Sequence, residues 1–302
     1  MPQSVDPRRR ASLLALFVTF LWATSWILIK IGLKEIPALT FAGLRYFIAF
    51  LSLLAYYLYK GGLKHIHALS RRDWKGLVVL GLVMYTITQG TQFLALNYLP
   101  AITFSLLLNF SAPLVALMGI FLLKESITPL QWTGIAVFLL GIAAYFYPHW
   151  IPQGQALGLL IGVASMAATS SAAVIGRFIN RSARLDPSTV TVVSMGIGSS
   201  LLLILGLAFE PWPHIDLAGW GIILWLAVVN GAFAFTLWNY TMQILSAAES
   251  SLINNTMLVQ IGILAWVFLG ERPDLKQIVG MAVVVVGVLL VNWKTTLPSE
   301  KL

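Results

Sequence analysis

Arg45 is the charged side chain that lies deepest inside a long apolar run of this sequence. It follows the start of the run Ala38–Tyr59 by about seven residues, which is roughly 10 Å along a helix. A charge at that depth in a bilayer is costly unless it pairs, reaches the headgroups or faces water. Two interpretations are open: a counter-charge for a substrate carboxylate near the outer mouth, or an architectural arginine that snorkels to the headgroups or binds carbonyl oxygens at a helix end.

Uncharged polar side chains in the middle of apolar runs are a second source of binding chemistry. Tyr85, Gln89 and Gln92 follow one another at i, i+4 and i+7, which places them on one stripe of a helix. A looser set in a later run consists of Asn230, Trp238 and Asn239. Such side chains line a solute path when they face a cavity, and they join neighbouring helices when they face protein. Both interpretations are open.

Trp22 and Trp26 lie four residues apart in the first apolar run. Tryptophan in an aromatic belt sits at the membrane surface, whereas these two lie well inside the run. Facing lipid, they would only fill space. Facing a cavity, they would favour flat or amphiphilic solutes, or would hold the ammonium group of an amino acid through a cation–π contact.

The groups that enzyme chemistry needs are missing from the apolar runs. The sequence has no Cys, its four His are in loops, and its acidic residues lie outside the middle of the runs. A metal centre, a nucleophile with its base, or a proton-carrying carboxylate would need such groups at membrane depth. No Walker or dinucleotide fingerprint occurs either. We therefore expect no enzyme, no metal and no cofactor, with an intramembrane enzyme as a less favoured alternative.

The composition is that of an integral membrane protein. The chain is 59% hydrophobic and 10% charged, with a mean hydropathy of +0.86, whereas soluble domains are about 25% charged. The net charge of +8 raises the question of nucleic acid. Apart from Arg45, however, the basic residues lie in the short loops or at the ends of the runs, as the positive-inside bias of membrane proteins requires. We expect the lipid bilayer as a partner and no nucleic acid.

Apolar runs of about 20 residues, each long enough to cross a bilayer as a helix, set the fold class. Ten such runs occur: Ala11–Ile31, Ala38–Tyr59, Trp74–Leu96, Ala101–Leu123, Leu130–Tyr147, Ala156–Phe178, Thr189–Phe209, Leu217–Gln243, Glu249–Gly270 and Leu275–Trp293. The loops between them are short, so neighbouring helices must be antiparallel. The sequence predicts an all-α integral membrane protein with ten transmembrane helices.

The stretch from Leu99 to Gly141 returns 146 positions later, from Leu245 to Gly287, which indicates an internal repeat. Identical pairs include Asn109 and Asn255, Glu125 and Glu271, and Gly141 and Gly287. The same offset maps the first five helices onto the second five. The predicted units are an N-terminal tail at 1–10, a first repeat at 11–148, a second repeat at 156–293 and a C-terminal tail at 294–302.

Five is an odd number, so the two repeats must cross the membrane in opposite directions. Inverted repeats of this kind permit alternating access, in which equivalent halves exchange inward-open and outward-open shapes around a central site. Most of the 19 basic residues lie on the side that holds both predicted tails. The positive-inside rule therefore predicts that both termini face the cytoplasm.

The repeat adds candidates for the central site. Asn109 and Asn255 are repeat mates, and they could bond to each other at the pseudo-twofold axis or line the cavity. Thr169 lies among small residues in the helix that matches the first one. Small residues there allow either close helix packing or open space for a substrate.

The repeat also contains features that could bend or end a helix. Pro113, in the middle of the fourth run, frees a carbonyl group and permits a bend, so it is either a gating hinge or a passive kink. Glu125 and Glu271, in the turns, are expected to cap helices rather than to bind substrate.

The segments WATSWILIK, PALTFAGLRY, ALNYLPAITFSLLLNFSAPLVALMGIFLLKE, and AAESSLI followed by FLGE also resemble a known family. They are similar to the EamA-type repeats of the drug/metabolite transporter superfamily. This resemblance implies a ten-helix carrier of the bacterial inner membrane, often an exporter of amino acids or other small metabolites. In the second repeat, Val259 stands where the family usually has the proline that matches Pro113.

Together these patterns predict a secondary transporter that moves a small organic metabolite, best an amino acid or a related amphiphilic solute, by alternating access. A passive channel or facilitator is the alternative, and an intramembrane enzyme is the less favoured hypothesis from another class. The predicted substrate-binding residues are Trp22, Trp26, Tyr85, Gln89, Gln92, Asn109, Thr169, Trp238, Asn239 and Asn255, with Pro113 as the hinge and Arg45 as the charge in the membrane.

Overall fold

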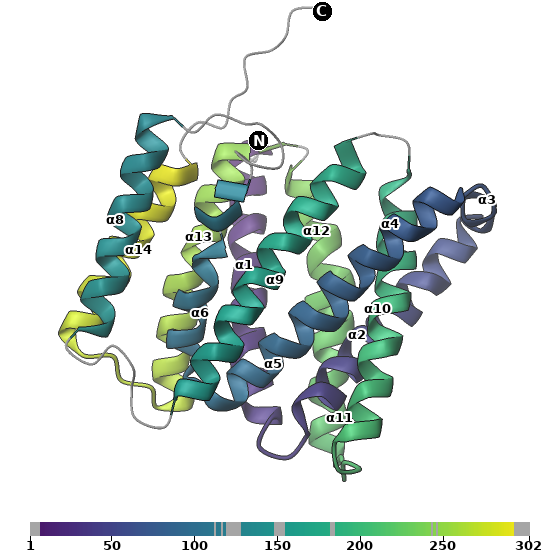
Figure 1. Ribbon diagram of the computed structural model, residues 1–302, viewed down its shortest axis with the longest axis horizontal. Coiled ribbons are helices and arrows are strands. Elements are labelled where there is room, and N and C mark those ends of the chain that lie inside the picture. The colour runs from purple at the N-terminus through teal and green to yellow at the C-terminus, as the bar shows by residue number, and fades with distance from the viewer. Residues whose placement is uncertain are drawn as a thin grey trace, which may run out of the picture.

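The computed structural model describes residues 7–111, 113–115, 117–118, 128–147, 155–181, 185–242, 244–245 and 247–292, whose regular structure is entirely helical (Figure 1). The elements are α1 (Pro7–Gly32), α2 (Ala38–Tyr59), α3 (Leu63–His67), α4 (Arg71–Gly81), η1 (Leu82–Thr88), α5 (Gln89–Tyr98), α6 (Ala101–Asn109), α8 (Pro129–Phe146), α9 (Ala156–Arg181), α10 (Pro187–Phe209), α11 (Leu217–Leu224), η2 (Trp225–Phe233), α12 (Ala234–Met242), α13 (Ala247–Leu264), η3 (Ala265–Leu269) and α14 (Leu275–Asn292).

Side-chain caps determine where several helices begin. Ser70 and Thr128 each open a capping box, in which the hydroxyl accepts from the third helical backbone N–H and that residue's side chain bonds back. Asp186 and Asp216 cap α10 and α11 by accepting one backbone N–H each, without the reciprocal bond. These caps satisfy N–H groups that a helix start leaves unpaired. They explain why helices begin directly after the polar loops.

Six of the described helical segments are long and apolar enough to cross a membrane. They are Pro7–Gly32, Ala38–Tyr59, Arg71–Tyr98, Pro129–Phe146, Ala156–Gly176 and Pro187–Phe209, and shorter apolar segments cover Ala101–Val115, Leu217–Gly231, Ile253–Leu269 and Leu275–Leu290. Many large apolar side chains are exposed on these segments, as a lipid-facing surface requires. The prediction of an all-helical membrane protein is confirmed, while ten crossings in two inverted repeats stay a prediction.

Three of the apolar segments contain a π-helical stretch that the sequence analysis did not foresee. The run predicted as one helix over Trp74–Leu96 is α4, η1 and α5 in succession, and η2 and η3 interrupt two later runs in the same manner. Such stretches widen the turn locally and often occur at functional sites. The widened turn of η1 ends just before Gln89, so the polar stripe does not follow a regular α-helical period.

The central helices pack as two groups. We call α1, η2, α12 and α13 the α1 group, because α1 packs against the other three. We call α9, η1, α5 and α6 the α9 group, because α9 packs against the other three. Helices α2 and α10 pack against each other, and α2 also contacts α5 and η2. Helix α2 therefore joins the two groups.

Helices α8 and α14 form a separate pair at one side of the bundle (Figure 1). Their backbones approach closely at glycines: a Cβ atom on Gly287 would lie 2.5 Å from the backbone nitrogen of Phe138, and one on Gly141 would lie 2.6 Å from that of Val284. Real Cβ atoms do not come that close. Glycine is therefore the residue that permits this contact, as small-residue packing between membrane helices requires.

Candidate functional site

A cluster of aromatic and polar side chains surrounds Arg45 inside the bundle. Its guanidinium carbon lies 5.0 Å from the ring centre of Tyr46 and 5.9 Å from that of Phe93. The Tyr46 hydroxyl donates a 2.6 Å hydrogen bond to Oε1 of Gln89, and its ring meets the ring of Tyr85 edge-on at 6.0 Å. Helix α2 therefore brings the predicted residues Arg45, Tyr85 and Gln89 together through Tyr46, which the sequence analysis did not single out.

Arg45 is half-buried, and in the described part of the chain it has neither a hydrogen bond nor a carboxylate partner. A guanidinium group carries five N–H donors. The described residues supply no bond from these donors to a carbonyl oxygen, which leaves an arginine that snorkels toward the headgroups as the architectural interpretation. Its described contacts are the cation–π contacts with the Tyr46 and Phe93 rings, and its role as a counter-charge for a substrate carboxylate stays a prediction.

The predicted tryptophans pack partly against other helices. The Trp22 Nε1–H donates to the backbone oxygen of Asn230 at 3.2 Å, and the Trp22 ring lies 5.2 Å from that of Trp238. The Trp26 ring lies 5.4 Å from the ring of Phe104 on α6. All three tryptophans are half-buried. They form an aromatic surface between α1, α12 and α6.

Asn230 in η2 is only 1% exposed and has one unsatisfied oxygen. Its Nδ2 donates to the backbone oxygen of Leu21 at 2.6 Å and to the hydroxyl of Ser25 at 2.5 Å. A carbonyl oxygen only accepts, so the NH₂ group must face α1 and Oδ1 must point elsewhere. Among the described residues Oδ1 has no partner. It is a buried acceptor that a ligand N–H could satisfy.

Gln260 on α13 also has a buried amide oxygen without a partner among the described residues, and it contacts a different side of α1. Its Nε2 donates to the hydroxyls of Thr19 at 3.2 Å and Thr256 at 3.1 Å. Both hydroxyls donate their own hydrogen to backbone carbonyl groups, so they must accept from the amide. Its Oε1 is buried and finds no partner in the described residues. Gln260 was not predicted, although a glutamine inside an apolar run is a signal that could have found it.

Within the described residues, the remaining polar candidates make no hydrogen bond to another helix. Asn109 donates to a carbonyl of its own helix at 2.8 Å, and Thr169 does the same on α9. Asn255 has a buried Nδ2 without a partner in the described residues, so the two repeat-mate asparagines do not bond to each other. Gln92 is half-buried and makes no hydrogen bond to a described residue. These four residues stay predictions as substrate ligands.

Pro113 is buried, and the helix before it ends. α6 stops at Asn109, whose carbonyl is the one that a proline four residues later cannot bond, and Phe110 forms a turn. The matching α13 continues through Asn255 to Leu264, as expected where valine replaces proline. The side chain of Asn239, and Glu125 as a whole, lie outside the described residues.

Two glutamates cap helices near the end of the bundle at which α1 ends and α2 begins, here called the Lys30 end. Glu271 accepts the backbone N–H groups of Ala101 and Ile102 at 2.7 and 3.0 Å, which confirms its predicted role as a cap. Glu210, which was not predicted, caps α2 in the same way. The capped helices both begin with Pro-Ala, an aliphatic residue, Thr and Phe, a similarity visible in the sequence.

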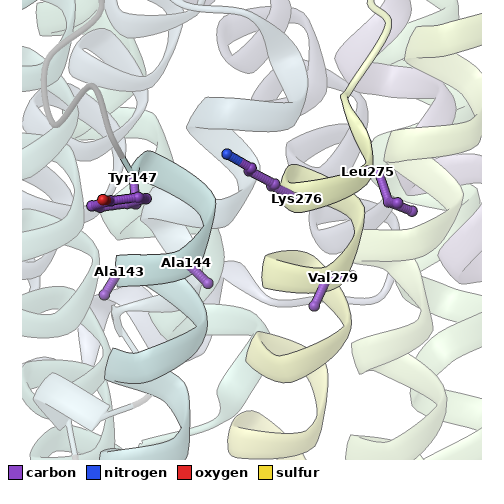
Figure 2. Close-up of a pocket in the computed structure, with 6 residues that line it drawn as sticks. All are labelled: Ala143, Ala144, Tyr147, Leu275, Lys276 and Val279. Carbon is purple, nitrogen blue, oxygen red and sulfur yellow. The ribbon is translucent and has the colours of Figure 1, made fainter.

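Two surface pockets lie apart from these polar clusters. One of about 540 Å³ lies between α8 and α14, where Lys276 extends from α14 toward α8 (Figure 2). It is lined by Ala143, Ala144, Tyr147, Leu275, Lys276 and Val279. Another of about 560 Å³ lies between α2, α10 and α11. Neither contains a predicted site residue, and we place the candidate site at the interior clusters instead.

Comparisons with known proteins also indicate a membrane transporter. A sequence model of the EamA-like transporter family matches residues 9–147 and again residues 156–293. A protein named uncharacterized transporter YvbV from Bacillus subtilis is 28% identical over 96% of this chain and 93% of its own. A probable amino-acid metabolite efflux pump from Escherichia coli is 26% identical over 65% of this chain and 62% of its own. A crystal structure that is 21% identical superposes with a TM-score of 0.66, covering 93% of this chain and 97% of that chain, and so shares the fold.

Proposed function

The chain belongs to the EamA-like transporter family, which its sequence matches over nearly its whole length, and we propose that it exports a small amphiphilic organic metabolite, best an amino acid, by alternating access. The observation that carries the substrate class is the guanidinium group of Arg45. It lies against two aromatic rings inside the bundle and has no hydrogen-bond or carboxylate partner among the described residues. The printed name of the Escherichia coli relative, an amino-acid metabolite efflux pump, points the same way.

The proposed recognition of the substrate has two parts. Arg45 binds the carboxylate, since a guanidinium fork matches its geometry. The amide oxygen of Asn230, which has no partner among the described residues, accepts from the ammonium group, and the indole rings of Trp22 and Trp26 contact the apolar body of the substrate. The two parts share a neighbour, because η2, which carries Asn230, contacts both α1 and α2.

Alternating access is proposed from the repeat. The family model matches the chain twice, once over each predicted five-helix unit. The packing is also equivalent under exchange of the halves: α1 packs on α12 and α13, and its repeat mate α9 packs on α5 and α6. An alternating-access cycle moves one group of helices against an equivalent group. The α1 group and the α9 group, with α2 and α10 beside them, fit such a cycle.

We further propose that the protein lies in a bacterial inner membrane with both termini in the cytoplasm. The distribution of Lys and Arg over the loops supports this orientation. It places the Lys30 end of the bundle at the outer surface.

Counterflow in proteoliposomes tests the function. Purified protein is reconstituted with a saturating unlabelled amino acid inside, and uptake of the labelled form is followed across a panel of amino acids, nucleosides and polyamines. A carrier gives transient accumulation of its substrate and saturates. Flux that rises linearly with concentration and lacks accumulation would identify a passive channel instead. Liposomes without protein, and protein with a non-substrate inside, are the controls.

A further inference from the structure

Hydrogen bonds from charged side chains join the α1 group to the α9 group at the Lys30 end. Lys30 on α1 donates through Nζ to the backbone oxygens of Leu96 and Leu99, at 2.5 and 2.6 Å. Leu96 lies in the last turn of α5, and Leu99 is the C-cap of that helix. Because a helix C-terminus carries partial negative charge and unpaired carbonyls, an ammonium group is well placed there.

The second link runs in the same direction across the same boundary. Glu271 follows η3, at the end of the helix that begins with α13. Both of its carboxylate oxygens accept backbone N–H groups from the first turn of α6, which belongs to the α9 group. A carboxylate at a helix N-terminus makes charge-assisted hydrogen bonds and complements the helix dipole. Lys30 thus binds the end of α5 and Glu271 binds the start of α6, on either side of the turn that joins these two helices. We call this turn the corner.

We propose that Lys30 and Glu271 form a gate that holds the Lys30 end closed, and that transport requires both links to break. This inference rests on the proposed alternating access, which needs the two groups to separate at one end at a time. Each link must exchange its backbone partners for water when the corner moves away. Opening then costs free energy in proportion to these bonds, and the closed shape is favoured while they are intact.

Glu210 provides a matched comparison within the same protein. Its carboxylate also accepts two backbone N–H groups of a helix first turn, at 2.9 and 2.7 Å, and the Thr40 hydroxyl at 2.9 Å. It lies at the end of α10 and caps α2, and these two helices pack against each other. The Glu210 cap therefore has the same chemistry as the Glu271 cap without linking the α1 group to the α9 group.

Distances between spin labels test the gate. The chain has no cysteine, so Ile31→Cys on α1 and Tyr98→Cys on α5, both at exposed positions, label the two groups specifically. In nanodiscs we expect Glu271→Ala and Lys30→Met each to shift the distance distribution toward longer values. Glu210→Ala should leave the distribution as in the parent. An unchanged distribution in Glu271→Ala, or an equal shift in Glu210→Ala, would overturn the gate.

Two readings separate this inference from the proposed function. The label distances do not depend on a substrate, so a shift without counterflow would keep the gate and reject the carrier. Normal counterflow without a shift would keep the carrier and reject the gate. If Glu271→Ala does not elute as a monodisperse species, the Lys30→Met distribution decides the matter, because that variant leaves the α6 cap in place.

Discussion

The phenol of Tyr46 on α2 donates a 2.6 Å hydrogen bond to Oε1 of Gln89, the first residue of α5. The same ring contacts Arg45 and Tyr85. Tyr46 thus orients an amide, a guanidinium group and a second phenol at once. It is the residue that turns separate candidates on η1, α5 and α2 into one cluster.

Tyr46→Phe should keep the ring contacts and remove only the bond to Gln89. Because a buried hydrogen bond contributes about 1 kcal/mol, we expect about a fivefold increase in the KM for the transported amino acid, with little change in maximum rate. Gln89→Leu should abolish transport while folded protein remains in the membrane. Counterflow measures both variants. Tyr56→Phe, at a tyrosine that is 63% exposed on the same helix, is the control, and an equal increase there would contradict the assignment.

Arg45→Met should reduce the transport of carboxylate-bearing substrates by at least about tenfold, which corresponds to about 1.4 kcal/mol. The reason is that no other described cation lies against the Tyr46 and Phe93 rings. Arg45→Lys keeps the charge and loses the planar fork, so an intermediate rate is expected. Arg272→Met, at an exposed loop position, serves as the control. Full transport by Arg45→Met would return this residue to an architectural role.

The bond between Asn230 and Ser25 should couple the two residues energetically. Interhelical hydrogen bonds in membrane proteins contribute about 0.6 kcal/mol on average. A double-mutant cycle of Asn230→Ala and Ser25→Ala, measured by unfolding in mixed micelles, should give a coupling of about that size. Ser171, the repeat mate of Ser25, bonds to a carbonyl of its own helix. Asn230→Ala combined with Ser171→Ala should therefore be additive, and coupling there would argue against the interhelical bond.

Gly287→Ala should destabilise the protein by about 1–3 kcal/mol, since the added Cβ would lie 2.5 Å from a backbone nitrogen of α8. Gly221 on α11 has nothing within 4 Å of the equivalent position. Gly221→Ala should raise stability slightly, because alanine favours helix by up to about 1 kcal/mol over glycine. Thermal unfolding in detergent compares the two changes. Opposite signs are expected, and a loss of equal size in both would contradict close packing at Gly287.

Several local features of the molecule were predictable from residue types alone. Glu271 lies in a turn between apolar runs, and a carboxylate there caps a helix start, as the structure has it. Pro113 cannot bond the carbonyl of Asn109, and α6 ends at that residue. The side chain of Asn239 and all of Glu125 lie outside the described residues, so their predicted roles stay predictions.

Other features could not be predicted, because they depend on which segment faces which. The π-helical stretches η1 and η2 leave no period in the sequence that distinguishes them from α-helix. The sequence shows Gln260 inside an apolar run and Glu210 at the end of one, but it does not show which distant segment each residue contacts. They become significant only because Thr19 and the first turn of α2, both distant in sequence, lie against them.

The sequence by itself determined the class of this protein, since apolar content, run length and loop charge are properties of each segment in water or lipid and need no partner. It also determined the repeat and the family resemblance. Only the tertiary structure decided which polar groups are satisfied. Within the described residues, the Arg45 donors and one oxygen of Asn230 have no hydrogen-bond partner, whereas the Lys30 ammonium group donates to carbonyl groups of a neighbouring helix. Hydrogen bonding depends on ångström-scale distances between helices, and those distances are set by packing of the whole bundle.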